Sequence, residues 1–405
     1  MHRVVFDEPY EFIPPYRGTF WSTAFQLYLP RHLKKADGLT SWDCRGAERL
    51  KASLAAGHGV LLCPNHCRPS DPMAMGIVNR AARCHSYSLA SWHVFKQNRL
   101  QSYVTRRLGG FSIYREGMDR QALNTAIEIV ANAERPLIVY PEGVISRSNN
   151  RLLSLMDGVA FIARSAAKKR VKQQPDRKVV IHPVALRYVF KGDVRATVTP
   201  VLTSIEQRLS WRPRDGDDIF YRIRRIGRAL VGLKEIEHFG RVRSGSIYDR
   251  LEYLVDSILT GIEDKWLGGP ADGPVVQRVK KIRSAIIPNM VTEELSESER
   301  DSRWRDLTSA YYAQQMSHYP RDYVSSDSPP EHVLETVERF EEDLTDKVQV
   351  HSPMHLILEI GEPIEVPTKR PRDEEQQVMF RLRQALTSML AALGDEVAAG
   401  RASSS

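Results

Sequence analysis

The chain has few cysteines and no long apolar run, and both absences narrow its class. Four cysteines among 405 residues do not make the disulfide framework of a secreted protein, which favours a reducing, cytoplasmic compartment. Asp7, Glu8 and Glu11 interrupt the segment in which a secretory leader would have its apolar core. No stretch reaches the roughly 18 uninterrupted apolar residues of a spanning helix. Any membrane contact is therefore predicted to be peripheral, on the inner face of a membrane.

The composition is that of an ordinary globular protein with an uneven charge. Hydrophobic residues make up 42% and charged residues 27%, which excludes collagen-like, low-complexity and fully disordered classes. The formal net charge is +8, but residues 1–250 carry a surplus of 19 positive charges and residues 251–405 a surplus of 11 negative charges. The basic part indicates an anionic partner, such as a membrane surface or a phosphorylated molecule. Nucleic acid is not predicted, because no recognisable reading module is present.

The first 40 residues form a distinct N-terminal segment. Residues 12–33 are rich in Phe, Tyr, Trp and Leu, and Arg31, Lys34 and Lys35 lie at their end. This composition is typical of an amphipathic segment at a membrane interface. It is equally typical of a helix packed on a core, and the sequence leaves both interpretations open.

Residues 41–204 alternate short apolar runs with helical periods. The runs at 58–63, 136–140 and 178–190 are rich in Val, Ile and Leu and indicate strands. Residues 120–134 and 152–170 place apolar side chains on one helical face. Strands alternating with helices predict a layered α/β fold with a mixed, largely parallel sheet. Chemistry in such folds lies where loops leave the strand ends.

Residues 205–405 are predicted to be a mainly helical C-terminal region, and no internal repeat is evident. One strand is expected near 355–366, and it could return to the sheet of the first part. A further helix is expected around 373–393. The last residues, 396–405, are expected to be a frayed tail.

The most informative stretch is CPNHCRPSDPM, residues 63–73, which follows the first predicted strand. A carboxylate near an imidazole fixes its tautomer and stabilises the charge that it gains with a proton, so His66 and Asp71 are a candidate general base. Asp71 before Pro72 is also typical of a helix N-cap, and this alternative stays open.

Two further stretches carry candidate anion-binding groups. In GGFSIYREG, residues 109–117, a short β-like run ends at Arg115, whose guanidinium suits a phosphate; the alternative is a surface pair with Glu116. In PLIVYPEGVISRSNNRL, residues 136–152, polar and cationic groups follow a buried strand, as expected for an anion site. Gly143 there lets the backbone approach a ligand closely.

In this order the three stretches resemble the motifs of the glycerolipid acyltransferases, the family of glycerol-3-phosphate and lysophosphatidic acid acyltransferases. That family carries Asn-His, four residues and Asp; then Phe/Tyr-Ile-x-Arg; then Phe-Pro-Glu-Gly-Thr-Arg-Ser; then a strand with Pro-Val. The matching positions here are Asn65, His66 and Asp71; Phe111 through Arg115; Tyr140 through Gly143; and HPVAL at 182–186. The resemblance covers roughly residues 58–190. It departs after Gly143, where Val144 and Ile145 precede Ser146 and Arg147, so the arginine lies two positions later.

The resemblance implies an acyl transfer to a hydroxyl. His66 would remove a proton from the hydroxyl of a glycerol-phosphate or lysophospholipid acceptor as it attacks the thioester of acyl-CoA or acyl carrier protein, with Asp71 orienting the ring. The residues implied to position the acceptor are Arg115, Glu142, Gly143 and Arg147. No metal and no cofactor besides the acyl donor is implied, and a peripheral contact with an anionic membrane surface fits the basic half of the chain.

Three alternatives remain. Cys63, Cys67, Cys84 and His85 could bind zinc, although their spacing lacks the paired short intervals of strong zinc motifs. A catalytically idle lipid-surface or scaffold protein with the same fold is the second. The third concerns the basic run at 168–172, which could bind headgroups or an acyl carrier, or simply end a solvated helix.

Overall fold

The structure is a computed structural model that describes residues 6–345, 347, 349–368 and 374–403. The chain divides into two compact units. The sheet unit comprises Tyr10–Tyr114, Met118–Lys191 and the described part of Val350–Ser405. The helical unit comprises Arg115–Gly117 and the described parts of Met1–Pro9 and Gly192–Gln349. The chain passes between these units after residues 9, 114, 117, 191 and 349. The boundaries predicted from the sequence lie after residues 40 and 204.

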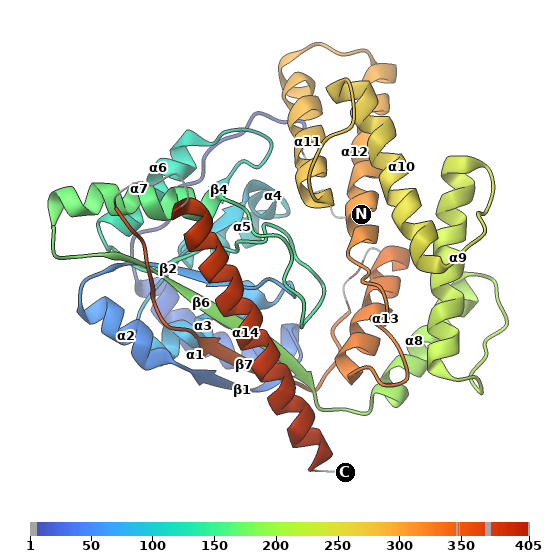
Figure 1. Ribbon diagram of the computed structural model, residues 1–405, viewed down its shortest axis with the longest axis horizontal. Coiled ribbons are helices and arrows are strands. Elements are labelled where there is room, and N and C mark those ends of the chain that lie inside the picture. Colours follow the sequence, from blue (N-terminus) through green and yellow to red (C-terminus); the bar gives the residue numbers. More distant parts are fainter. Residues whose placement is uncertain (1–5, 346, 348, 369–373, 404–405) are drawn as a thin grey trace. The chain divides into compact units, whose positions relative to one another are not determined.

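The sheet unit is a layered α/β structure, as predicted (Figure 1). Its strands are β1 (Leu39–Arg45), β2 (Gly59–Pro64), β3 (Tyr87–Ser91), β4 (Gly110–Ile113), β5 (Leu137–Ile138), β6 (Val179–Phe190), β7 (Met354–Ile360) and β8 (Ile364–Glu365). Its helices are α1 (Phe20–Ala36), α2 (Ala47–Ala55), α3 (Asp71–Ala82), α4 (Trp92–Lys96), α5 (Arg99–Arg107), α6 (Arg120–Ala131), α7 (Gly158–Gln173) and α14 (Glu374–Ala402).

The strand order is β1-β7-β6-β2-β5-β3-β4, and β8 also pairs with β6. Neighbouring strands are parallel except where β6 meets β7 and β8. The sheet is therefore mixed and largely parallel, which confirms the predicted fold class. The strand indicated near 355–366 corresponds to β7 and β8, and β7 lies between β1 and β6.

One large core lies between the sheet and the helices α6, α7 and α14 (Figure 1). Successive residues of a strand point to opposite faces of the sheet. The alternate side chains of β2, β5 and β6 that point to this face pack against the three helices. Two predicted helices differ in extent from the structure. The helix indicated at 152–170 begins only at Gly158, because the backbone before it is bonded to Glu142, as described below. The tail predicted over 396–405 is helical as far as Ala402, and residues 404–405 lie outside the described part.

The helical unit is built from α8 (Val194–Arg208), α9 (Ile219–Phe239), α10 (Ile247–Leu267), α11 (Val275–Thr292), α12 (Glu297–Ser317) and α13 (Pro330–Thr345). Side chains of α9 to α12 form its main apolar core. None of the helices in the described ranges of either unit has the length and apolar composition needed to cross a bilayer.

Three successive connections of this unit, α8–α9, α9–α10 and α10–α11, are closed by the same contacts, here named the Glu–Arg clasp. A fully buried glutamate accepts the backbone N–H eight residues later and the guanidinium of an arginine 15 or 16 residues later, in the next helix. The three sets are Glu206, Arg214 and Arg222; Glu235, Arg243 and Arg250; and Glu263, Ala271 and Arg278.

The loop that follows each glutamate of the Glu–Arg clasp also begins with a similar backbone conformation. The second and third helix ends pass through Gly240 (φ 70°) and Gly268 (φ 75°), and the first passes through Ser210 (φ 58°), all left-handed. A buried carboxylate is tolerated when hydrogen-bond donors and an opposite charge saturate it, and each clasp supplies both. The helical unit therefore contains a structural repeat that the sequence alone did not reveal.

Candidate active site

The first motif begins where the backbone leaves β2. All six residues of β2 are buried, and its pairing with β6 ends at Pro64, opposite Val184. The side chain of Asn65 extends the ladder: its Oδ1 accepts the Leu186 N–H at 2.7 Å, and its Nδ2 donates to the Leu186 carbonyl at 3.1 Å. These bonds fix the point at which His66 follows the sheet.

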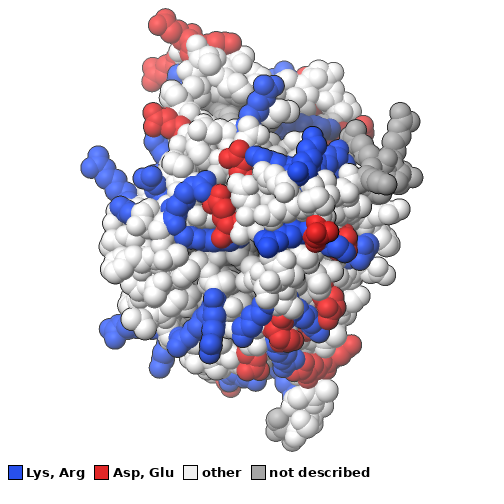
Figure 2. All heavy atoms as spheres, turned by 90° about the vertical axis from the view of Figure 1, so that its left-hand side faces the viewer, with Lys and Arg blue, Asp and Glu red and all other residues white. Residues whose placement is uncertain are grey.

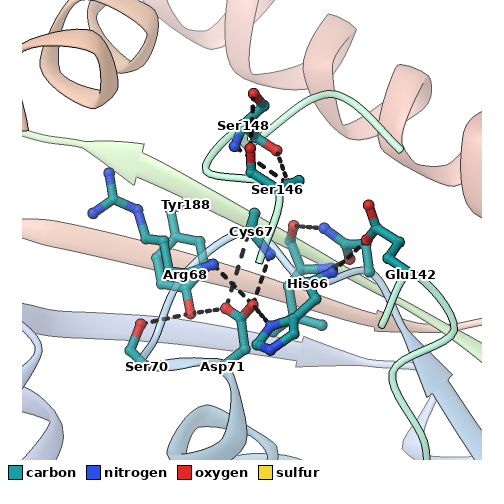
Figure 3. Close-up of polar contacts among 11 residues, drawn as sticks. His66, Cys67, Arg68, Ser70, Asp71, Glu142, Ser146, Ser148 and Tyr188 are labelled. Atoms are coloured by element: carbon teal, nitrogen blue, oxygen red, sulfur yellow. Dashed lines mark hydrogen bonds and ion pairs between the residues drawn. The ribbon is translucent and has the colours of Figure 1, made fainter. Parts of the chain in front are cut away.

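The Asp71 carboxylate accepts hydrogen bonds from several groups of the loop that precedes it (Figure 3). Its Oδ2 lies 2.8 Å from Nδ1 of His66 and accepts the backbone N–H groups of Cys67 at 2.7 Å and Arg68 at 2.9 Å. Asp71 is the first residue of α3, and Ser70 is its N-cap. The carboxylate accepts these bonds from residues that precede it, so it organises the loop and does not cap the helix in the usual way.

The His66 ring is held on one edge and on one face. With Nδ1 donating to a carboxylate, the neutral ring carries its lone pair on Nε2. No residue in the described part of the chain hydrogen-bonds Nε2, and the side chain is 13% exposed. The ring stacks on Tyr140, with centroids 4.0 Å apart and planes at 28°. The geometry thus leaves one accessible basic nitrogen in a fixed orientation.

A further donor to Asp71 comes from the sheet and was not predicted. The hydroxyl of Tyr188, on β6, donates to Oδ1 of Asp71 at 2.6 Å and lies 3.0 Å from Oγ of Ser70. Tyr188 follows the Pro-Val strand motif, but no local sequence signal couples it to a residue 117 positions earlier.

Glu142 holds two loops together rather than opening to solvent. It is 1% exposed, and its oxygens accept the backbone N–H groups of His66 at 2.7 Å and Leu153 at 2.8 Å. Burial raises the pKa of Glu142 to about 7, against the effect of these two N–H groups. Both oxygens are therefore occupied by backbone, one of them directly at the candidate base.

The loop after Glu142 turns back towards His66. Gly143 adopts a left-handed conformation (φ 70°), and a side chain there would collide with the sulfur of Met156. The backbone N–H of Ser146 donates to the His66 carbonyl at 2.7 Å. The third motif thus lies beside the first, as the strand-end argument predicted.

The two predicted anion-binding arginines, Arg147 and Arg115, belong to different units. Arg147 lies in this loop, partly buried and left-handed (φ 55°), between buried Ser146 and Ser148. Arg115 belongs to the helical unit, so its role in the site stays a prediction.

The alternative pairing of Arg115 with Glu116 is also answered in part. The side chain of Glu116 pairs with Arg283 and also accepts the backbone N–H of Arg115, at 3.2 Å. Burial, and then the neighbouring Arg283, lower the pKa of Arg115 to about 10, so its guanidinium remains charged at neutral pH.

The cysteines do not assemble a metal site in the described part of the chain, where no three His, Cys, Asp or Glu side chains gather as ligands. Cys63 and Cys67 are buried, and burial raises the pKa of the Cys63 thiol. Burial also raises the pKa of Cys84 to about 11. The thiols of Cys63 and Cys84 therefore remain protonated, as expected for structural cysteines.

Comparison with known proteins agrees with these motifs. Residues 41–187 match the family model described as Acyltransferase. This part of the chain is an acyltransferase domain of the glycerolipid acyltransferase family, which confirms the resemblance. The domain supports acyltransferase activity in general, with an acyl donor and a lipid acceptor as the substrates that the family implies. No curated protein matches the chain.

Proposed function

We propose that the protein transfers a fatty acyl group from acyl-CoA or acyl carrier protein to a hydroxyl of a glycerol-phosphate or lysophospholipid acceptor. The carrying observation is the pair formed by His66 and Asp71, 2.8 Å apart, which leaves Nε2 of His66 with its lone pair directed away from the carboxylate. That nitrogen is the general base of the proposed reaction.

The reaction needs no covalent enzyme intermediate. Nε2 of His66 takes the proton of the acceptor hydroxyl as its oxygen bonds to the thioester carbon. The tetrahedral intermediate then collapses, the C–S bond breaks, and the imidazolium returns the proton to the leaving sulfur. Asp71 stabilises the imidazolium between these two steps. Its side chain is completely buried, so water does not screen the attraction between the two charges.

The acceptor is positioned by the loop that carries Arg147. In this proposal Arg147 binds the phosphate of the acceptor, because a guanidinium matches phosphate oxygens in pairs. For Arg115 the same role is proposed from the family resemblance alone. Glu142 and Gly143 act one step further away: both oxygens of Glu142 are bonded to backbone, and Gly143 shapes the turn. Through these contacts they position the loop and the base.

The lipid acceptor is approached, in this proposal, through an exposed surface on α1 and α5, here named the aromatic surface. Leu29 and Leu33 pack α1 onto the unit, so the helix is both anchored and exposed. Trp21 contacts Tyr103, with ring centroids 5.8 Å apart. The exposed apolar residues are Phe20, Trp21, Leu27 and Tyr28 on α1, and Leu100 and Tyr103 on α5. Aromatic and apolar side chains beside basic ones are typical of interfacial binding.

The basic charge supports this contact only locally. Figure 2 shows Lys and Arg side chains spread over one face in small groups, with Asp and Glu between them. In the basic run of α7, Arg170 is buried and donates to the carbonyls of Ala131 and Gly57, and Lys169 pairs with Glu128 at 3.2 Å. Two of the four cations of that run are thus bonded within the protein, and Lys168 and Lys172 are exposed. We favour the aromatic surface for a peripheral contact on the cytoplasmic side.

The test is a panel of acceptors with a labelled acyl donor. Glycerol-3-phosphate and a series of lysophospholipids are incubated with acyl-CoA or acyl carrier protein, and free thiol and product mass are measured. Thiol release that requires acceptor supports the proposal. Binding to anionic vesicles without any thiol release would favour the idle, lipid-surface alternative.

The membrane contact has its own test. Sedimentation with vesicles of phosphatidylcholine and phosphatidylglycerol should show weaker binding for the double variant Trp21→Ser, Leu27→Ser. The matched control is Leu233→Ser, an exposed leucine on α9 of the helical unit. Equal binding by the two variants would remove the aromatic surface from the proposal.

A further inference from the structure

Tyr188 stands at the centre of a buried hydrogen-bond chain that the reaction scheme has not used. It is 1% exposed, and its hydroxyl bonds both Asp71, at 2.6 Å, and Ser70, at 3.0 Å. Figure 3 shows the three side chains converging from β6 and from the start of α3. The chain therefore joins the central sheet directly to the candidate catalytic pair.

The direction of each bond follows from the chemistry of the groups. An ionised carboxylate only accepts hydrogen bonds, so the single proton of the Tyr188 hydroxyl goes to Asp71. The Ser70 hydroxyl must then donate to Tyr188. The chain runs from Ser70 to Tyr188 to Asp71, and His66 donates to Asp71 from the other side.

The two oxygens of Asp71 have unequal support. Oδ2 receives His66 and two backbone N–H groups, whereas the one short bond to Oδ1 within the described residues comes from Tyr188. The other Oδ1 contact, from the Cys67 thiol, is 3.9 Å long and weak. Without Tyr188, Oδ1 would lose its main donor while the carboxylate stayed buried.

We propose, building on the function above, that Tyr188 is a positioning residue: it fixes the plane of the Asp71 carboxylate and tempers its charge, and thereby sets both the orientation and the basicity of His66. Burial raises the pKa of Tyr188 well above its usual value of 10, so the hydroxyl keeps its proton and remains a donor.

Tyr188 also connects the base to the acceptor loop. The Tyr188 backbone N–H donates to Oδ1 of Asn149 at 2.7 Å, and Nδ2 of Asn149 donates to the Tyr188 carbonyl. Asn149 is fully buried and lies two residues after Arg147. Tyr188 therefore hydrogen-bonds Asp71 through its hydroxyl and the loop that carries Arg147 through its backbone.

Three other titratable groups, described next, lie around the hydrogen bonds of Ser70, Tyr188 and Asp71 and contribute to the pH dependence of the site. Burial, and then the charge of Asp71, raise the pKa of Asp37 to about 6. Burial raises the pKa of Glu142 to about 7, and that of Tyr140 well above its usual value. These groups are unchanged when Tyr188 alone is altered, so a comparison of variants isolates the effect of its hydroxyl.

The test compares Tyr188→Phe with Ser70→Ala and with the control Tyr87→Phe. Tyr87 is a similarly buried tyrosine of the same sheet, on β3. A hydrogen bond to a charged group corresponds to a change of about tenfold in rate, so Tyr188→Phe should lower kcat about tenfold, with a smaller loss for Ser70→Ala. Tyr87→Phe should leave kcat unchanged.

Two further readouts separate positioning from general damage. Tyr188→Phe leaves more negative charge on Asp71, so the acid limb of the pH–rate profile should move to higher pH. The NMR titration of the His66 imidazole should move to higher pH than in the wild type. The titration needs no substrate, so it tests Tyr188 even if no acceptor in the panel is used.

The results of these measurements distinguish the role of Tyr188 from the proposed function. An upward His66 titration in Tyr188→Phe, absent from Tyr87→Phe, supports the inference. An unchanged titration overturns it, whatever the activity. Wild-type activity that is lost in His66→Ala but retained with an unchanged pH profile in Tyr188→Phe would overturn the role of Tyr188 and leave the proposed function standing. Absence of acyl transfer with every acceptor would instead count against the proposed function.

Discussion

The imidazole of His66 lies on the phenol ring of Tyr140, with centroids 4.0 Å apart and 28° between the ring planes. Asp71 holds one edge of the imidazole and Tyr140 holds one face, so two independent contacts fix the ring. The Tyr140 hydroxyl is buried and has no hydrogen-bond partner in the described part of the chain. The ring, and not the hydroxyl, is therefore the useful part of this side chain.

Substitution of Tyr140 should separate these two parts. Tyr140→Phe keeps the stack and removes an unpaired hydroxyl, so we expect kcat within about twofold of wild type and a gain in unfolding free energy of about 1 kcal/mol. Tyr140→Ala loses the stack and should lower kcat about tenfold. Thiol-release kinetics and urea denaturation measure both effects. A large loss in Tyr140→Phe would instead show that the hydroxyl contacts substrate.

Removal of the base should abolish the reaction. His66→Ala is expected to lower kcat by about a thousandfold, the contribution of a well-placed general base, without loss of the fold. The control is His58→Ala, a histidine whose Nδ1 accepts only a long bond from the Lys178 N–H, at 3.4 Å. Thermal unfolding of both variants checks the fold. Full thiol release by His66→Ala would eliminate the proposed mechanism.

The arginines should act on the acceptor and not on the donor. Arg147→Ala and Arg115→Ala are each expected to raise the acceptor KM about tenfold, the size of a lost charged hydrogen bond, with little change in the acyl-donor KM. Arg151→Ala, an exposed arginine of the same loop, is the control. Equal changes in both KM values would argue against a phosphate site at these residues.

Stability should depend on pH through Glu142. Its pKa is about 7 in the folded protein, above the ordinary value of 4.5, so the folded state holds a proton that the unfolded state releases between these values. The free energy of unfolding of the wild type therefore falls as pH rises from about 4.5 to 7, and is lowest, in this respect, above pH 7. Glu142→Gln lacks this contribution, so its stability relative to wild type should rise by about 3 kcal/mol across the window.

Urea denaturation of both proteins at pH 5 and pH 8 measures the difference. The Glu142→Gln variant would also lose one acceptor for the N–H groups of His66 and Leu153, but that loss is the same at both pH values. A stability difference that does not change with pH would contradict the buried, proton-binding state of Glu142.

The Glu–Arg clasps should be costly to break. Glu235 is fully buried, and Glu235→Ala leaves the buried guanidinium of Arg250 without its carboxylate partner, so the helical unit is expected to lose about 3–5 kcal/mol. Glu252→Ala, which removes an exposed pair with Arg321, should change stability by less than about 1 kcal/mol. Urea denaturation followed by circular dichroism measures both. Equal, small losses would show that the clasp is not a structural element.

The sequence predicted those features that depend on local patterns. The buried runs that became β2 and β6 and the amphipathic period of α6 were visible, because burial and periodicity are encoded in neighbouring residues. The strand β1 was not predicted, since its exposed residues, Thr40 and Ser41, give it no apolar run. The pair of His66 and Asp71 could be predicted because both residues lie in one loop.

Long-range contacts were beyond such reasoning. Tyr188 reaches Asp71 across 117 residues, and Asn149 reaches Tyr188 across 39. Each clasp likewise depends on which glutamates the packing buries, and similar Glu and Arg residues elsewhere are exposed. Composition and spacing do not distinguish these cases, because burial is decided by the whole fold.

The antiparallel pair of β6 and β7 has a consequence for the order of assembly. Phe190 pairs with Met354, and the Lys191 N–H donates to the Pro353 carbonyl at 3.0 Å, so residues 192–349 separate, in the sequence, two strands that pair directly. Within the described strands, β1 pairs only with β7. During synthesis β1 stays without its neighbour β7 until residues 354–360 have left the ribosome. The sheet that carries His66 is therefore completed only after the helical unit has been made.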